Sequence, residues 1–205
     1  MASSRETGAP VAGVILAAGL ARRMGGSKVL LPWQGRPLVR HVAEVALASQ
    51  LDEILVVTGH RAHDVGAVLR DLPLRVIHNP DYQGGLSTSL RAGIAALGED
   101  VAGALIMLAD QPLLTSTAID SLLQAYWRTA APIVAPFAHG RRGNPVLFAR
   151  ALFPDLLEVA GDEGARAVIE AYRDRMEGVE VDEAVFQDVD TPEVYAALSD
   201  RPADS

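Results

Sequence analysis

Short apolar runs alternate with amphipathic stretches along most of this chain, and this alternation constrains the fold more than any other feature of the sequence. The runs are too apolar for strands with one face in water, so they predict strands buried on both faces. They span Val11–Leu16, Ile54–Thr58, Leu74–His78, Ala104–Leu108 and Ile133–Ala135. The amphipathic stretches predict helices at Leu38–Ser49, Asp64–Leu72, Ser87–Leu97, Ser116–Thr129 and Glu163–Tyr172. The predicted fold class is α/β, with three layers: an open, mostly parallel sheet and helices on both of its faces.

The alternation breaks after Pro136 and changes again near the C-terminus. Turn-forming residues occur at Gly140, Gly143, Asn144 and Pro145, before a short apolar run at Val146–Phe148. We predict an irregular insertion there that adds one antiparallel strand. Further on, Thr191 suits a helix N-cap and Pro192 a first helical residue, which predicts a last helix at Pro192–Leu198. We expect one domain over residues 11–198, flanked by flexible ends at 1–10 and 199–205.

Composition narrows the classes of function. The 205 residues include 18 Lys and Arg against 26 Asp and Glu, a net charge of −8, and no cysteine. That balance argues against binding to nucleic acid or to an anionic membrane surface, since both require a broad basic surface. The absence of cysteine excludes disulfides, thiolate nucleophiles and cysteine-ligated metals. The apolar run at Val11–Leu20 is half the length of a membrane span and lacks the flanks of a signal peptide, so we expect a cytoplasmic protein.

The loop after the first predicted strand is the strongest candidate for ligand binding. In open α/β sheets, ligands bind beyond the carboxyl ends of the strands, where this loop begins. Small residues at Ala17, Ala18 and Gly19 allow backbone N–H groups to approach an anion, and Arg22, Arg23 and Lys28 follow as cations. The spacing fits neither a P-loop nor a G-x-G-x-x-G fingerprint. The alternative interpretation is a surface loop with solvated arginines.

The segment from Leu16 to Lys28 resembles the L-A-x-G-x-S-x-R-M-G-x-x-K signature of the MobA/MocA-like nucleotidyltransferases, which attach a nucleoside monophosphate to molybdopterin. It matches at Leu16, Ala17, Gly19, Arg23, Met24, Gly25 and Lys28, and departs at Ala21, where the family often has Ser. Similar stretches occur at His78–Tyr82, Gly85–Leu90, Gly143–Val146 and Asp188–Glu193. The resemblance implies a Rossmann-type fold like that of nucleotide-diphospho-sugar transferases. Ala18 favours CTP over GTP, because the guanylyl-transferring branch typically has Gly there.

Two aspartates suggest a metal site. Asp110 follows a buried apolar run, and Asp190 is expected to end another strand in the same manner, so both carboxylates would lie at one edge of the sheet. Two carboxylates together with nucleotide phosphates suit Mg²⁺, and the resemblance implies this role for Asp110 and Asp190. Asp188 is a weaker candidate. The alternative for Asp110 is a turn or a helix cap.

The remaining expected site residues follow from these patterns and from the resemblance. We expect catalytic roles for Arg23, Lys28 and Asp110, because holding phosphates and neutralising charge are what phosphoryl transfer chiefly requires. The expected nucleotide-binding residues are Leu16, Ala17, Ala18, Gly19, Arg23, Lys28, Thr58, Asn79, Gly85, Ser87 and Asp110. Arg142, Asn144 and Asp188 are candidates for binding the acceptor, and a solvated basic loop is the alternative for the first two.

The predicted activity is Mg²⁺-dependent transfer of CMP from CTP to the phosphate of molybdopterin, with release of pyrophosphate. The expected partners are CTP, a molybdopterin-type acceptor and an apoenzyme of the molybdenum hydroxylase class. Two alternatives keep the reaction but use GTP, or a sugar or polyol phosphate as acceptor. A third, from another class, is a nucleotide- or cofactor-binding maturation partner without turnover; a pair of metal-binding acids argues against it, since binding alone does not require them.

Overall fold

The computed structural model describes residues 8–19 and 27–199. Its main sheet has the strand order β10-β7-β9-β6-β1-β4-β5, with β8 paired to β7 beside this path. The strands are β1 (Val11–Ala17), β4 (Glu53–Thr58), β5 (Arg75–His78), β6 (Gly103–Leu108), β7 (Ile133–Ala138), β8 (Arg141–Arg142), β9 (Val146–Ala149) and β10 (Met176–Glu180). A separate hairpin joins β2 (Pro32–Trp33) to β3 (Arg36–Pro37).

Strand direction follows the prediction of a mostly parallel sheet. β1 pairs in parallel with β4 and β6, β4 with β5, and β7 with β10. β9 runs antiparallel to both β6 and β7, and it is the strand predicted after the break at Pro136. The turn before it also forms the short β8, which is antiparallel to β7. The α/β class with an antiparallel strand is therefore confirmed.

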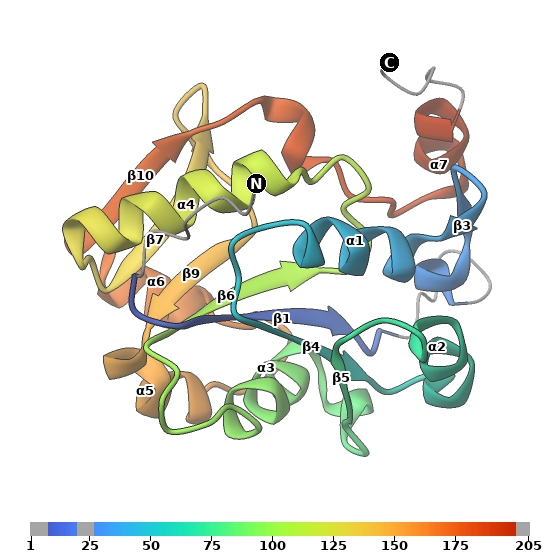
Figure 1. The fold of residues 1–205 in the computed structure, drawn as a ribbon, viewed down its shortest axis with the longest axis horizontal. Coiled ribbons are helices and arrows are strands. Elements are labelled where there is room, and N and C mark those ends of the chain that lie inside the picture. Colours follow the sequence, from blue (N-terminus) through green and yellow to red (C-terminus); the bar gives the residue numbers. More distant parts are fainter. Residues whose placement is uncertain (1–7, 20–26, 200–205) are drawn as a thin grey trace, which may run out of the picture.

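Helices cover both faces of the sheet (Figure 1). They are α1 (Leu38–Leu47), α2 (Ala62–Leu69), α3 (Leu86–Ala95), α4 (Ser116–Thr129), α5 (Phe153–Leu157), α6 (Arg166–Ala171) and α7 (Pro192–Ser199). One apolar core joins the sheet to α1, α2 and α4, and a second joins it to α3, α5 and α6. All seven residues of β1 are buried, as expected for a strand covered on both faces.

The elements that the sequence did not predict are short or polar. β10 reads Met-Glu-Gly-Val-Glu and forms an edge of the sheet, where charged side chains are common and an apolar run is not needed. α5 is five residues long and the hairpin strands are two residues each, below the length at which periodicity is visible. The predicted helix at Glu163–Tyr172 starts three residues later, at Arg166.

One prediction about the C-terminal segment was wrong. Asp188 and Asp190 lie in an extended segment that is not a strand of the sheet. Val189 is fully buried, and its N–H donates to the carbonyl oxygen of Asp110 at 2.9 Å, so one backbone hydrogen bond rather than a ladder holds the segment at the end of β6. The helix cap is confirmed, because Thr191 Oγ1 accepts from the N–H of Val194 at 3.3 Å and α7 begins at Pro192.

The N-terminal residues that the structure describes are tied to the domain. Trp127 Nε1 donates to the carbonyl oxygen of Ala9 at 3.0 Å. The N–H of Ala102 donates to the carbonyl oxygen of Pro10 at 2.8 Å. None of the helices in residues 8–19 and 27–199 has the length and apolar character needed to cross a membrane.

Candidate active site

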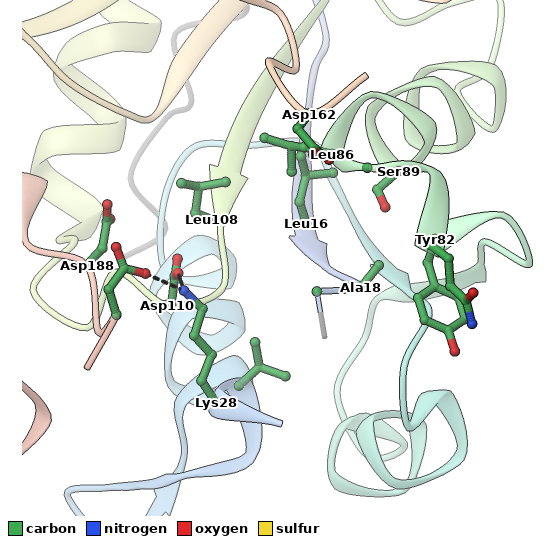
Figure 2. A pocket seen from close by; sticks show the side chains of 15 residues that line it. Leu16, Ala18, Lys28, Tyr82, Leu86, Ser89, Leu108, Asp110, Asp162 and Asp188 are labelled. Carbon is green, nitrogen blue, oxygen red and sulfur yellow. Dashed lines mark hydrogen bonds and ion pairs between the residues drawn. The ribbon is translucent and has the colours of Figure 1, made fainter. Parts of the chain in front are cut away.

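Three parallel strands end together at the edge of the sheet where the site lies. Leu16 of β1 is in register with Val57 of β4 and with Leu108 of β6. A cavity of about 530 Å³ opens at this edge (Figure 2). It is lined by Leu16, Ala18, Gly19, Lys28, Val29, Tyr82, Gln83, Gly85, Leu86, Ser89, Leu108, Asp110, Asp162, Asp188 and Asp190. The predicted loop and both predicted aspartates therefore meet at one cavity.

Lys28 lies between two aspartates at one end of this cavity. It is the first residue of the short 3₁₀ helix η2 (Lys28–Leu30), which follows the loop. Lys28 Nζ is 2.7 Å from Oδ1 of Asp190, and it also forms an ion pair with Oδ2 of Asp110. Lys28 is the single lysine of the chain; the other 17 basic residues are arginines. A compact ammonium suits this position because it can turn its three donors toward several oxygens.

The pKa of Lys28 is raised above its usual value. Burial acts to lower it, but the carboxylates of Asp110 and Asp190 outweigh that effect through charge and hydrogen bonding. Lys28 is therefore a cation throughout the physiological range, suited to neutralising phosphate charge and unsuited to accepting a proton.

Two buried carboxylate oxygens at this cavity have no hydrogen-bond partner among residues 8–19 and 27–199. They are Oδ1 of Asp110, a residue that is 8% exposed, and Oδ1 of Asp188. Burial, together with the charges of Asp110 and Asp190, raises the pKa of Asp188 to about 6. In residues 8–19 and 27–199, no group of three or more His, Asp or Glu side chains is arranged as a ready metal site. The three aspartates share a cavity with the Lys28 ammonium instead.

Glycines shape the other end of the cavity, which Tyr82 and Ala18 line in Figure 2. A Cβ on Gly59 would lie 2.4 Å from Cβ of Tyr82 and 2.9 Å from Cβ of Ala18, so only glycine allows this close packing. Gly85 has a φ of +97°, and a Cβ there would lie 2.2 Å from Oδ1 of Asp162. The glycines thus let three loops converge around the cavity.

The predicted nucleotide-binding residues divide into two groups. The first group lines the cavity and consists of Leu16, Ala18, Gly19, Lys28, Gly85 and Asp110. The second group is buried next to the cavity without lining it and consists of Ala17, Thr58, Asn79 and Ser87. Arg23 lies outside the described residues. The lining residues that sequence reasoning did not name as binding include Tyr82, Gln83, Leu86, Ser89 and Asp162, which sit in loops or at a helix start and have no charge pattern to mark them.

Asn79 serves the local structure through all the polar atoms of its side chain. Its Nδ2 donates to Oγ1 of Thr88 at 2.9 Å and to Oγ of Ser89 at 3.1 Å. Its Oδ1 accepts from the N–H of Asp81 at 3.0 Å. Asn79 therefore joins the end of β5 to the first turn of α3 and holds the loop between them.

The predicted acceptor residues fall in two adjoining cavities. Asp188 lines the larger one, whereas Arg142 and Asn144 line a second cavity of about 210 Å³. The two cavities share Leu16, Leu86 and Leu108, so they adjoin at the carboxyl ends of β1 and β6.

The sequence matches the MobA-like NTP transferase domain over residues 13–176, which cover the cavities except for the C-terminal aspartates. The protein belongs to the MobA-like NTP transferase family. This confirms the resemblance stated from the loop after β1, and membership of the family implies a nucleoside triphosphate as substrate.

Three relatives show how varied the named roles are within this family. The chain is 35% identical over 196 residues to nicotine blue oxidoreductase of Paenarthrobacter nicotinovorans, covering 89% of this chain and 93% of the relative. It is 33% identical to purine catabolism protein PucB of Bacillus subtilis (strain 168), with the same coverage. It is 27% identical to molybdenum cofactor cytidylyltransferase of Escherichia coli (strain K12), covering 92% of this chain and 95% of the relative.

Solved structures of similar proteins agree with the fold. Rv0371c of Mycobacterium tuberculosis H37Rv is 27% identical and superposes with a TM-score of 0.85, covering 95% of this chain and all of the relative. Its complex with manganese superposes with a TM-score of 0.80, covering 93% and 98%.

Proposed function

We propose that this protein is a Mg²⁺-dependent cytidylyltransferase that moves CMP from CTP to the phosphate of molybdopterin and releases pyrophosphate. The observation that carries the proposal is Lys28 held between Asp110 and Asp190 at the end of a cavity of about 530 Å³. Family membership supplies the reaction class. The similarity to molybdenum cofactor cytidylyltransferase along nearly the whole chain supports the choice of substrates.

The donor set fits a divalent cation of the hard, oxygen-preferring kind. Oδ1 of Asp110 and Oδ1 of Asp188 are buried without partners, and a buried carboxylate oxygen without a partner is costly unless something neutralises it. Mg²⁺ prefers carboxylate oxygens together with substrate phosphates. Asp110 and Asp190 would hold the ion, with Asp188 as a further oxygen donor. When bound, it would neutralise charge on the phosphate that is attacked. The manganese complex of a relative supports the use of a divalent cation.

The chain's own residues then hold and orient the polyphosphate. In the proposed reaction, an oxygen of the acceptor phosphate forms a bond to the α-phosphorus, and the bond from that phosphorus to the bridging oxygen of the β-phosphate breaks. The electron pair leaves with pyrophosphate. Lys28 stays protonated and donates to the departing phosphates, and Arg23, outside the described residues, is proposed to do the same. No side chain has to act as a nucleophile.

The other end of the cavity is proposed to hold the nucleobase. The Ala18 methyl group lines this end of the cavity and takes up room that a glycine would leave free, which supports a small pyrimidine over a purine. Gly19 and Gly85 bring backbone close to the nucleotide. Thr58, Asn79, Ser87 and Ala17 contribute by holding the surrounding loops, in keeping with their buried positions. The modified cofactor would pass to an apoenzyme of the molybdenum hydroxylase class.

A pyrophosphate-release assay with CTP, GTP, ATP and UTP tests the proposal. Purified protein is mixed with molybdopterin and Mg²⁺, and Asp110→Asn serves as the matched inactive variant. We expect release with CTP, slower release with GTP, and none without acceptor. Release only with a sugar or polyol phosphate would replace the acceptor, and no release with any nucleotide would favour a binding partner. Reduction of nicotine blue without pyrophosphate release would favour the chemistry named for the relative that is 35% identical.

A further inference from the structure

Lys28 supplies the positive charge beside three aspartates at one end of the larger cavity, Asp110, Asp188 and Asp190 (Figure 2). Carboxylates that share a cavity repel one another unless a cation neutralises them. The ammonium of Lys28 contacts Oδ1 of Asp190 at 2.7 Å and forms an ion pair with Oδ2 of Asp110. Lys28 is thus the counter-ion of the same two carboxylates that are proposed to hold a divalent cation.

A divalent cation and the Lys28 ammonium compete for these carboxylates. Mg²⁺ binds carboxylate oxygens at about 2.0–2.1 Å, so an ammonium on the same carboxylate is its near neighbour. Oδ1 of Asp110 has no partner within the described ranges, but a cation there would still lie against the ammonium on Oδ2. The side chains of Lys28 and Asp110 are largely buried, and like charges repel strongly where water is scarce.

The cavity offers the Lys28 ammonium a second set of partners. Lys28 lines the cavity in which the triphosphate is proposed to bind. Its ammonium is carried on a flexible four-carbon stem and has three donors that can rotate. Its charge is retained in either position, because the pKa of Lys28 is raised above the usual value by its carboxylate partners. Lys28 can therefore move from the aspartates to the oxygens of a polyphosphate without leaving the cavity.

We propose that Lys28 is an exchangeable counter-ion, which holds Asp110 and Asp190 until the polyphosphate of a nucleotide draws its ammonium away and opens both carboxylates to the divalent cation. This role rests on the proposed function, because it needs a nucleotide and a cation in the cavity. It adds an order of binding to that function. The cation alone binds weakly, and the nucleotide and the cation strengthen each other's binding by the same factor.

The single lysine of the chain makes this exchange directly observable by NMR. Protein labelled with ¹³Cε-lysine gives one lysine signal, and its chemical shift reports the partners of the Lys28 ammonium. Spectra are recorded without metal for the protein alone, with α,β-methylene CTP and with inorganic tripolyphosphate, which has no base. Asp190→Asn removes the charge of one partner of Lys28. Asp182→Asn is the matched control, because Asp182 is an exposed aspartate that caps a 3₁₀ helix.

We expect Asp190→Asn to shift the Lys28 signal of the protein alone and to leave it unchanged in both complexes, because the ammonium no longer contacts Asp190 there. Asp182→Asn should not shift the signal in any of the three samples. An equal shift by Asp190→Asn with and without polyphosphate would overturn the inference, since Lys28 would then stay on the aspartate. No shift by Asp190→Asn in the protein alone, or no binding of either polyphosphate without metal, would overturn it as well.

Metal affinity gives an independent readout. Mn²⁺ binding without nucleotide is measured by electron paramagnetic resonance for the unaltered protein, Lys28→Met and Arg61→Met. Lys28→Met keeps a side chain of similar length without its charge, so it should bind Mn²⁺ at least about tenfold more tightly. Arg61 pairs with Asp64 on the exposed surface, and Arg61→Met should change Mn²⁺ affinity by less than about twofold. Unchanged or weaker Mn²⁺ binding by folded Lys28→Met would contradict the exchange.

The melting temperature of Lys28→Met checks that this variant is folded, and the NMR experiment does not depend on it. The two proposals fail in different ways. If CMP transfer is absent while Lys28 moves from Asp190 to tripolyphosphate, the proposed function is wrong and the counter-ion exchange stands. If CMP transfer occurs while Asp190→Asn shifts the Lys28 signal equally with and without α,β-methylene CTP, the exchange is wrong and the proposed function stands.

Discussion

Lys28 and Asp110 form the ion pair on which the proposed chemistry depends. We expect Lys28→Ala and Asp110→Ala each to lower turnover at least about a hundredfold, because each removes charge stabilisation at the reacting phosphates. Steady-state pyrophosphate release measures this, and circular dichroism verifies that the variants are folded. Arg61→Ala removes an equally cationic side chain that pairs with Asp64 on the exposed surface, and it should leave turnover unchanged. Near-normal rates in either site variant would contradict the assignment.

Ala18 tests the choice of base at the other end of the cavity. Replacing it by glycine removes the methyl group that lines the wall beside Gly59. We expect Ala18→Gly to raise kcat/KM for GTP relative to CTP by about tenfold, the scale of one methyl-sized contact in a specificity pocket. The ratio from parallel assays with both nucleotides is the measurement. A ratio that does not move would show that the base is selected elsewhere.

Asp188 gives a stability prediction with a definite sign. Its pKa is about 6 in the folded protein against 3.8 for a free aspartate, so the folded state holds the proton more tightly and the ionised carboxylate destabilises the fold. That cost is absent below about pH 4 and complete above about pH 6. Without metal ions, Asp188→Asn should therefore raise the free energy of unfolding by about 1–3 kcal/mol at about pH 8. Near pH 4 the two proteins should be equally stable.

Urea denaturation at the two pH values measures the effect of Asp188→Asn. Asp182 offers a control, because its Oδ1 accepts from the N–H of Ala184 at the exposed start of a 3₁₀ helix. Asp182→Asn should show no gain in stability at high pH. A gain for Asp188→Asn that persists at about pH 4 would indicate better packing in place of relieved charge.

At the scale of elements, the junction between β5 and α3 supports the cavity through Asn79. Asn79→Ala should cost about 2–3 kcal/mol in the free energy of unfolding, since it removes three hydrogen bonds from a side chain that is 3% exposed. Ser121 donates within α4 on the exposed surface, so Ser121→Ala should cost less than about 0.5 kcal/mol. Equal stabilities in urea titrations would contradict the structural role of Asn79.

Some helices and strands can be predicted from the sequence, and others cannot. Val11–Leu16 and Ala104–Leu108 were predictable because strands buried on both faces leave continuous apolar runs. β10 is not predictable, because a short edge strand that contains Glu177, Gly178 and Glu180 has no apolar run to mark it. Asp190 is expected at the end of a strand because the helix start at Thr191 and Pro192 follows it directly. The backbone of residues 188–190 instead makes a single hydrogen bond to Asp110, a long-range contact that no local pattern encodes.

For the site, the sequence indicated the residues whose chemistry is visible in their type. Lys28, Asp110 and Asp190 meet at one cavity, as the resemblance implies, although Asp190 does not end a strand of the sheet. Asn79 and Thr58 were expected at the nucleotide for the same reason, but their side chains hydrogen-bond to neighbouring loops and strands.

At the scale of the whole molecule, an acidic protein has to bind an anionic nucleotide. The net charge of −8 opposes such binding. Lys28 and three aspartates lie together at one edge of the sheet, where a divalent cation could neutralise the charge of the polyphosphate. The apolar cavity with Arg142 and Arg166 adjoins the same edge. The architecture therefore places two cavities side by side at the ends of β1 and β6.

The fate of the phosphates of CTP tests the central claim most directly. The protein is incubated with molybdopterin, Mg²⁺ and CTP labelled either at the α-phosphorus or at the γ-phosphorus. We predict that the α-label appears on the acceptor and the γ-label in pyrophosphate, in equal amounts, and that both transfers require acceptor and Mg²⁺. Release of the α-label as free CMP, or retention of both labels in CTP with every acceptor tried, would contradict a nucleotidyl transfer at this site.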